Sequence, residues 1–142
     1  MRAVGPVKLA GPEVEGEFLL PLATYEKPLW PSVLRGARVS AAIGGLRAVV
    51  IDERMTRSIL LEAPNAAAAL AVVGALPGRR AELEAAASAS SRFTRLLDWH
   101  SQIVGNLLFL RFAFATGDAA GHNMATAAAE RLQDFLLRAY PT

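Results

Sequence analysis

The first third of the chain combines short apolar runs with turn-forming residues and then changes to a helical pattern. Residues 7–23 are predicted to be extended, with a turn at Gly11-Pro12, because their apolar runs are bounded by proline and glycine. Across residues 28–42 the apolar side chains fall on one side of a helix, which Gly44-Gly45 ends. Residues 46–51 are rich in β-branched side chains and are predicted to form a strand.

From residue 58 onward the pattern predicts six elements in the order strand, helix, helix, strand, strand, helix. Their predicted ranges are 58–62, 65–74, 79–89, 93–102, 106–115 and 117–140. Asn65 is the expected N-cap of the first helix, and Val104-Gly105-Asn106 is the expected hairpin turn. In the last segment apolar residues recur at spacings of three and four, which is typical of an amphipathic helix.

This order predicts the α+β class and a ferredoxin-like βαββα arrangement whose last strand is missing. A complete arrangement of that kind needs one more strand after the last helix, and the sequence stops at Thr142 without it.

Composition narrows the functional classes. The 142 residues suit one domain of ordinary size, and the 53% hydrophobic content excludes a disordered chain. The absence of cysteine excludes disulfides, thiolate zinc sites and a cysteine nucleophile. With only two histidines and no cysteine, the sequence predicts no metal site. A net charge of +2 is too small to indicate the basic surface that is typical of nucleic-acid-binding proteins. The sequence has no apolar run of about 20 residues and no signal-peptide pattern, so we expect no membrane contact and a cytoplasmic protein.

Residues 117–124 (Gly-Asp-Ala-Ala-Gly-His-Asn-Met) are the most informative stretch, because a strand is expected to end there and a helix to begin near Asp118. The free N–H groups and the positive dipole end of such a helix would face an anionic or polar ligand, and Gly121 would allow a close backbone approach. Asp118 either caps the helix or accepts a hydrogen bond from a ligand amide. An ordinary capped helix is the alternative interpretation.

The same stretch resembles the GDAMGMN signature of the 3-hydroxy-3-methylglutaryl-CoA (HMG-CoA) reductase family, with Ala120 and His122 where the family usually has methionines. Further segments resemble family motifs in the same order along the chain. They are 5–9 (GPL), 22–26 (MATTEG), 35–38 (NRGCRA), 54–57 (GMTR) and 91–96 (SRFARL). The resemblance implies an oxidoreductase that reduces HMG-CoA, a CoA thioester, to mevalonate.

Three residues are implied by the resemblance to act on the substrate. Glu26 is similar to the catalytic glutamate, which moves a proton at the substrate carbonyl, and such a role needs a partly desolvated carboxyl group. Arg35 resembles an arginine that contacts the CoA moiety, and Arg57 one near the substrate carboxylate and the cofactor. Without the resemblance, Glu26 is an exposed residue at a helix start and both arginines are solvated.

The resemblance also implies a site for NADP(H), with NAD(H) as the alternative cofactor. Arg92 is the expected contact to a 2′-phosphate, although the residues around it are equally typical of a charged strand edge. The residue at position 122 departs from the family pattern, so the contacts there are open. The implied cofactor-binding residues are Ser91, Arg92, Phe93, Asp118, Gly121, His122 and Asn123.

Taken with the motifs, the chain is expected to divide into residues 1–56, a partial substrate- and CoA-binding segment, and residues 57–142, an NAD(P)-binding small domain. The family's catalytic lysine, aspartate and C-terminal histidine are expected beyond Thr142, so turnover is expected to need a complementing segment. A homodimer, a higher oligomer or a complementing chain is implied, because the family builds its active site between subunits. The alternatives are a non-catalytic dinucleotide- or CoA-binding or scaffolding module, and a ferredoxin-like domain that associates through alanine-rich helices.

Overall fold

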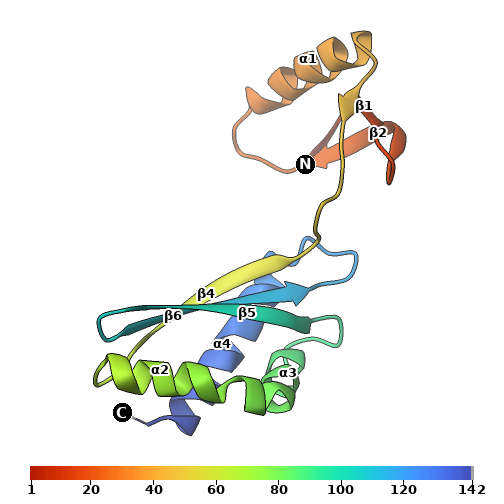
Figure 1. Cartoon of the computed structure of the whole chain (residues 1–142). Helices are drawn as coiled ribbons and strands as arrows, with labels where there is room; N and C mark the ends of the chain where they lie inside the picture. The colour runs from red at the N-terminus through yellow and green to blue at the C-terminus, as the bar shows by residue number, and fades with distance from the viewer. Residues whose placement is uncertain (142) are drawn as a thin grey trace. The chain divides into compact units, whose positions relative to one another are not determined.

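The protein is a mixed α+β chain with two small sheets, described here by a computed structural model for residues 1–141 (Figure 1). Packing divides it into two compact units, Met1–Asp52 and Glu53–Thr142. This division lies four residues before the expected one at 56/57. No helix within the described residues is long and apolar enough to cross a membrane.

The first unit is a three-stranded sheet covered by one helix. The antiparallel pair β1 (Arg2–Ala10) and β2 (Glu15–Leu22) confirms the expected extended stretch with its turn, and β3 (Leu46–Arg47) lies parallel to β1. Helix α1 (Leu29–Ala42) packs on β1 and confirms the helix expected at 28–42. Three apolar residues are buried in this unit: Val4, Val7 and Ala37.

The strand expected at residues 46–51 is wrong beyond Arg47. The two residues of β3 pair with the last two residues of β1. The backbone N–H of Ala48 still donates to the carbonyl oxygen of Ala10 at 3.1 Å, but residues 49–51 are exposed and irregular. β-Branched residues favour a strand only where a neighbouring strand supplies partners, and β1 supplies none past Ala10.

The second unit confirms the expected order of elements from residue 58 onward. Its elements are β4 (Met55–Glu62), α2 (Ala66–Ala75), the short 3-10 helix η1 (Pro77–Arg79), α3 (Arg80–Ser88), β5 (Arg95–Val104), β6 (Leu107–Ala115) and α4 (His122–Ala139). The three strands form an antiparallel sheet in the order β4-β6-β5. Asn65 caps α2 as expected, since its Oδ1 accepts the N–H of Ala68 at 2.9 Å.

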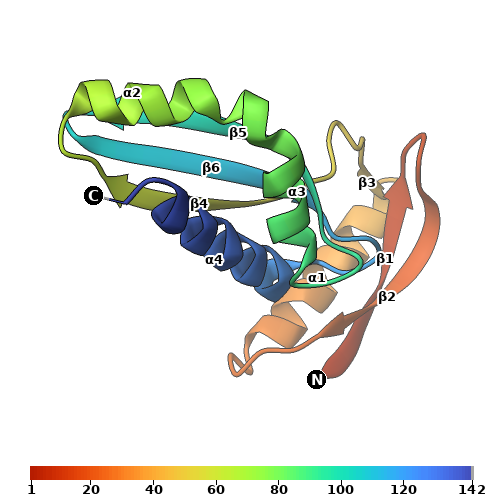
Figure 2. The ribbon, with the colours of Figure 1, turned by 90° about the horizontal axis from the view of Figure 1, so that it is seen from below.

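All three α-helices of this unit lie on one face of its sheet (Figure 2). The central strand β6 turns four fully buried side chains to them, at every second position: Leu108, Leu110, Phe112 and Phe114. Burying each contributes about 2 kcal/mol. The intervening position Arg111 is exposed on the opposite face, so the two faces of the sheet have different chemistry.

Candidate functional site

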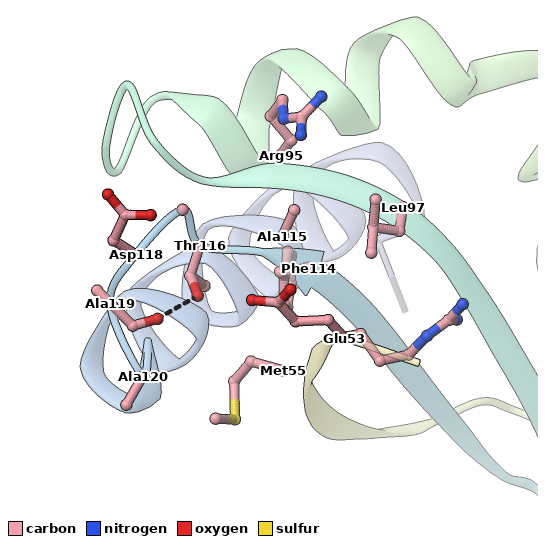
Figure 3. A pocket seen from close by; sticks show the side chains of 12 residues that line it. Glu53, Met55, Arg95, Leu97, Phe114, Ala115, Thr116, Asp118, Ala119 and Ala120 are labelled. Atoms are coloured by element: carbon pink, nitrogen blue, oxygen red, sulfur yellow. Dashed lines mark hydrogen bonds between the residues drawn. The ribbon is translucent and has the colours of Figure 1, made fainter. Parts of the chain in front are cut away.

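A pocket of about 570 Å³ opens at one end of the second sheet (Figure 3). The antiparallel register brings its walls together, because Met55 at the start of β4 and Arg95 at the start of β5 pair with Phe114 and Ala115 at the end of β6. The loop that follows β6 closes the pocket. The lining residues are Glu53, Arg54, Met55, Arg95, Leu97 and residues 114–120.

The loop between β6 and α4 is held by Thr116. This side chain is buried, and its Oγ1 donates a hydrogen bond to the carbonyl oxygen of Ala119 at 2.8 Å (Figure 3). Gly117 and Gly121 bracket the turn with φ values of 64° and 79°, a left-handed region that favours glycine. The turn therefore depends on glycine at both ends and on one internal hydrogen bond.

The expectation that the last helix begins near Asp118 is wrong. Helix α4 begins at His122, with Gly121 as its N-cap and no side-chain cap. The first N–H groups of an α-helix have no intrahelical acceptors and form the positive end of its dipole. In α4 no side-chain cap and no acidic residue of the first turn offsets them. Asp118 instead lies exposed in the turn and lines the pocket, which leaves the role of ligand acceptor open to it.

Arg57 lies against the start of α4. Its Nε donates to Thr126 Oγ1 at 3.0 Å and its Nη2 to the carbonyl oxygen of His122 at 3.4 Å. A third bond joins Nη1 to the carbonyl oxygen of Thr56 at 3.1 Å. A fixed cation beside the positive end of a helix is unfavourable by itself and becomes favourable when an anion binds there.

Residues 91–93 form the turn between α3 and β5. The N–H of Phe93 donates to Ser91 Oγ at 3.2 Å, and the Arg92 guanidinium lies 4.6 Å from the centroid of the Phe93 ring. Both Arg92 and Phe93 are exposed. Because β5 begins beside the end of β6, this turn and the 117–121 turn share one end of the sheet. The expected cofactor residues of the second unit thus lie at the same end of its sheet, and of them Asp118 is among the residues that line the pocket.

Glu26 and Arg35 belong to the first unit and are both exposed. Glu26 lies just before α1, where its carbonyl oxygen accepts the N–H of Leu29 at 3.0 Å. Its N–H donates to Thr24 Oγ1 at 3.0 Å. The surroundings of Glu26 therefore do not supply the desolvation that proton transfer would require.

Two residues of this end of the sheet were missed by reasoning from the sequence. Arg95 lines the pocket, and its presence in the 91–96 motif was a signal that could have identified it. Thr116 stands directly between a strongly apolar strand and a glycine, where a buried hydroxyl is not evident from periodicity.

Comparison with known proteins gives one consistent result. The sequence model of the family described as hydroxymethylglutaryl-coenzyme A reductase matches residues 2–142. The 3-hydroxy-3-methylglutaryl-coenzyme A reductase of Pyrococcus abyssi is 39% identical over 142 residues, covering 99% of this chain and 35% of its own length. That of Haloferax volcanii is 42% identical over 130 residues, covering 92% of this chain and 32% of its own.

A solved structure has the same fold. It is the class II 3-hydroxy-3-methylglutaryl-CoA reductase from Streptococcus pneumoniae bound to NADPH, with a TM-score of 0.65 and 22% identity over 98% of this chain and 34% of that one. The chain thus spans about a third of the length of the relatives it matches. Since the family model covers almost every residue, the chain belongs to the hydroxymethylglutaryl-coenzyme A reductase family.

Proposed function

We propose that this chain carries the nucleotide-binding part of an HMG-CoA reductase, which reduces the thioester to mevalonate with NADPH. The family membership supports the reaction. The observation that carries the proposal is the position of Arg57 on the uncapped first turn of α4, because this arrangement concentrates positive potential where a pyrophosphate would bind.

The finer fold assignment is part of the proposal. Strands β4 and β5 each run antiparallel to β6 between them, which is the order of a ferredoxin-like split β-α-β unit. Residues 57–142 would then be the NAD(P)-binding small domain, and residues 1–56 would belong to the part that binds substrate and CoA.

The residues at the end of the second sheet fit a dinucleotide. The N–H groups at the start of α4, including those of His122 and Asn123, would donate to the pyrophosphate together with Arg57. Gly121 is buried and Thr116 occupies the side on which its side chain would stand, so Gly121 would serve the site by forming the turn before α4. Asp118 lines the pocket and would accept a hydrogen bond from the nicotinamide amide. When bound, NADPH supplies the hydride for the reduction.

The turn at residues 91–93 would hold the adenosine end. Phe93 is 55% exposed, so a face of its ring not covered by Arg92 could stack on an adenine. Ser91 already orders the turn by accepting the Phe93 N–H. The exposed Arg92 would contact a 2′-phosphate, which would favour NADPH over NADH.

The substrate side of the proposal rests on the first unit. Glu26 would transfer a proton at the substrate carbonyl and Arg35 would contact the CoA phosphates. Because Glu26 is exposed, another segment or subunit has to cover it, and an oligomer or a complementing chain would provide that cover. The lysine that stabilises the developing oxyanion would come from the same source. We place the enzyme in the cytoplasm.

The exposed Glu26 also favours a second candidate, a family member that binds a dinucleotide without catalysis. Two measurements on the 142-residue chain separate the proposals. Calorimetry should detect NADPH binding, with NADH weaker, and Arg92→Ala should remove the preference for NADPH. The second measurement follows NADPH absorbance after HMG-CoA and a complementing segment are added. A loss of absorbance supports the reductase. NADPH binding without any loss of absorbance supports the non-catalytic module. Failure to bind either nucleotide would contradict both.

A further inference from the structure

The loop that forms one wall of the pocket has no side-chain anchor of its own. Residues 117–120 are Gly-Asp-Ala-Ala, and all four are exposed. None of these four residues has a side chain that packs into a core, so the segment would adopt many conformations in isolation. The fixed point must therefore come from a neighbouring residue.

Thr116 supplies that fixed point through two separate contacts. Its hydroxyl donates to the Ala119 carbonyl at 2.8 Å, which closes the turn. Its side chain also lies against Gly121, so closely that a Cβ built there would be 2.5 Å from Thr116 Oγ1 and 2.6 Å from Thr116 Cβ. Thr116 therefore contacts both Ala119 in the loop and Gly121, the N-cap of α4.

The geometry points to Thr116 as a positioning residue for the nucleotide site: it holds the 117–121 loop in the conformation that presents Asp118 and the first N–H groups of α4 to the ligand. This inference rests on the proposed function. Thr116 lines the pocket with only 9% of its surface exposed, and its hydroxyl already donates to Ala119, so its role is to hold the loop rather than to bind the nucleotide.

The cost of losing this hydroxyl should appear in binding more than in folding. Ala119 is exposed, so water can replace the lost partner of its carbonyl group. The released loop would spend only a fraction of its time in the binding-competent shape, and the apparent Kd rises in inverse proportion to that fraction.

Calorimetry on the full chain with two probes tests the inference. NADPH spans the whole proposed site, whereas adenosine 2′,5′-bisphosphate would engage only the 91–93 turn. Thr116→Val should weaken NADPH binding about tenfold, the equivalent of roughly one hydrogen bond. It should leave the bisphosphate within about twofold of wild type. Thr116→Ser keeps the hydroxyl and should bind NADPH within about threefold of wild type.

Thr94→Val is the matched control, because Thr94 is a second buried threonine of the same unit whose hydroxyl has no partner among residues 1–141. It should bind NADPH like wild type. Wild-type affinity in Thr116→Val, or equal losses for both probes, would overturn the inference, as would a Thr116→Ser variant as weak as Thr116→Val. If Thr116→Val does not fold, Gly121→Ala decides by the same two probes, since its Cβ would displace Thr116. No nucleotide binding by wild type contradicts the proposed function itself.

Discussion

The guanidinium of Arg57 is fixed against the first turn of α4, with Nη2 3.4 Å from the carbonyl oxygen of His122. Thr126 strengthens the arrangement, because its Oγ1 accepts from Arg57 and donates to the same carbonyl oxygen at 2.9 Å. An arginine that would repel the helix dipole is thereby held in place by hydrogen bonds. This arrangement is expected to become favourable when an anion binds beside Arg57 and the first turn of α4.

Arg57→Met should weaken NADPH binding about tenfold to a hundredfold, because a charge-assisted hydrogen bond to phosphate is lost. Calorimetric titration measures the change. Arg111→Met is the matched control, since Arg111 is exposed on the opposite face of the same sheet. Equal losses in the two variants would show that general charge, rather than the position of Arg57, determines affinity.

Gly121→Ala should lower the free energy of unfolding by about 1–3 kcal/mol, because alanine is strained at a φ of 79° and its Cβ would collide with Thr116. Gly74→Ala offers a contrast of opposite sign. Gly74 lies in α2 with no atom near its missing Cβ, so alanine should stabilise by about 0.5–1 kcal/mol. Urea denaturation of the two variants measures both effects, and a stable Gly121→Ala protein would contradict the described loop.

Thr94→Val should leave stability unchanged or raise it by about 1 kcal/mol. Thr94 is 1% exposed, and its Oγ1 has no hydrogen-bond partner within residues 1–141. An unpaired buried hydroxyl is costly, so an isosteric apolar side chain removes that cost. Thermal unfolding monitored by circular dichroism gives the comparison. A clear decrease in Tm would show that the hydroxyl has a bound water as partner.

Glu82→Gln should reduce stability at neutral pH and have no effect in acid. The hydrogen bond from Arg79 lowers the pKa of Glu82 below its ordinary value. A carboxyl group with a lowered folded-state pKa stabilises the fold above its unfolded pKa, and that contribution is lost as the pH falls through the folded pKa. Urea titrations of wild type and variant at several pH values should therefore converge at low pH. A difference that persists there would mean that packing, and not charge, distinguishes them.

How far the sequence could predict this structure differs between elements. Helix α2 was predictable, because Asn65 caps it through a local hydrogen bond from the N–H of Ala68, three residues further along the chain. Strand β6 was predictable because residues 107–114 form a short, nearly continuous run of apolar and aromatic side chains that follows a glycine-containing turn. Both signals come from residues close together in the sequence, and the structure confirms both elements.

The start of α4 and the end of β3 were not predictable in the same way. Asp118 has the side chain of a good N-cap, but the N-cap of α4 is Gly121 in the left-handed region, and Gly121 packs closely against Thr116. Residues 49–51 are β-branched, yet β1 ends before it can pair with them. In both cases a tertiary contact decides the outcome, and periodicity does not report such contacts.

The most direct measurement is a map of backbone amide chemical shifts of the 142-residue chain titrated with NADPH. Binding at the proposed site should shift residues 91–93 and 117–124 most, together with the side-chain signal of Arg57. The hairpin turn at Gly105-Asn106 lies at the opposite end of the same sheet and should stay unchanged. Shifts confined to residues outside that end of the sheet, or no shifts at saturating NADPH, would contradict the assignment of the nucleotide site.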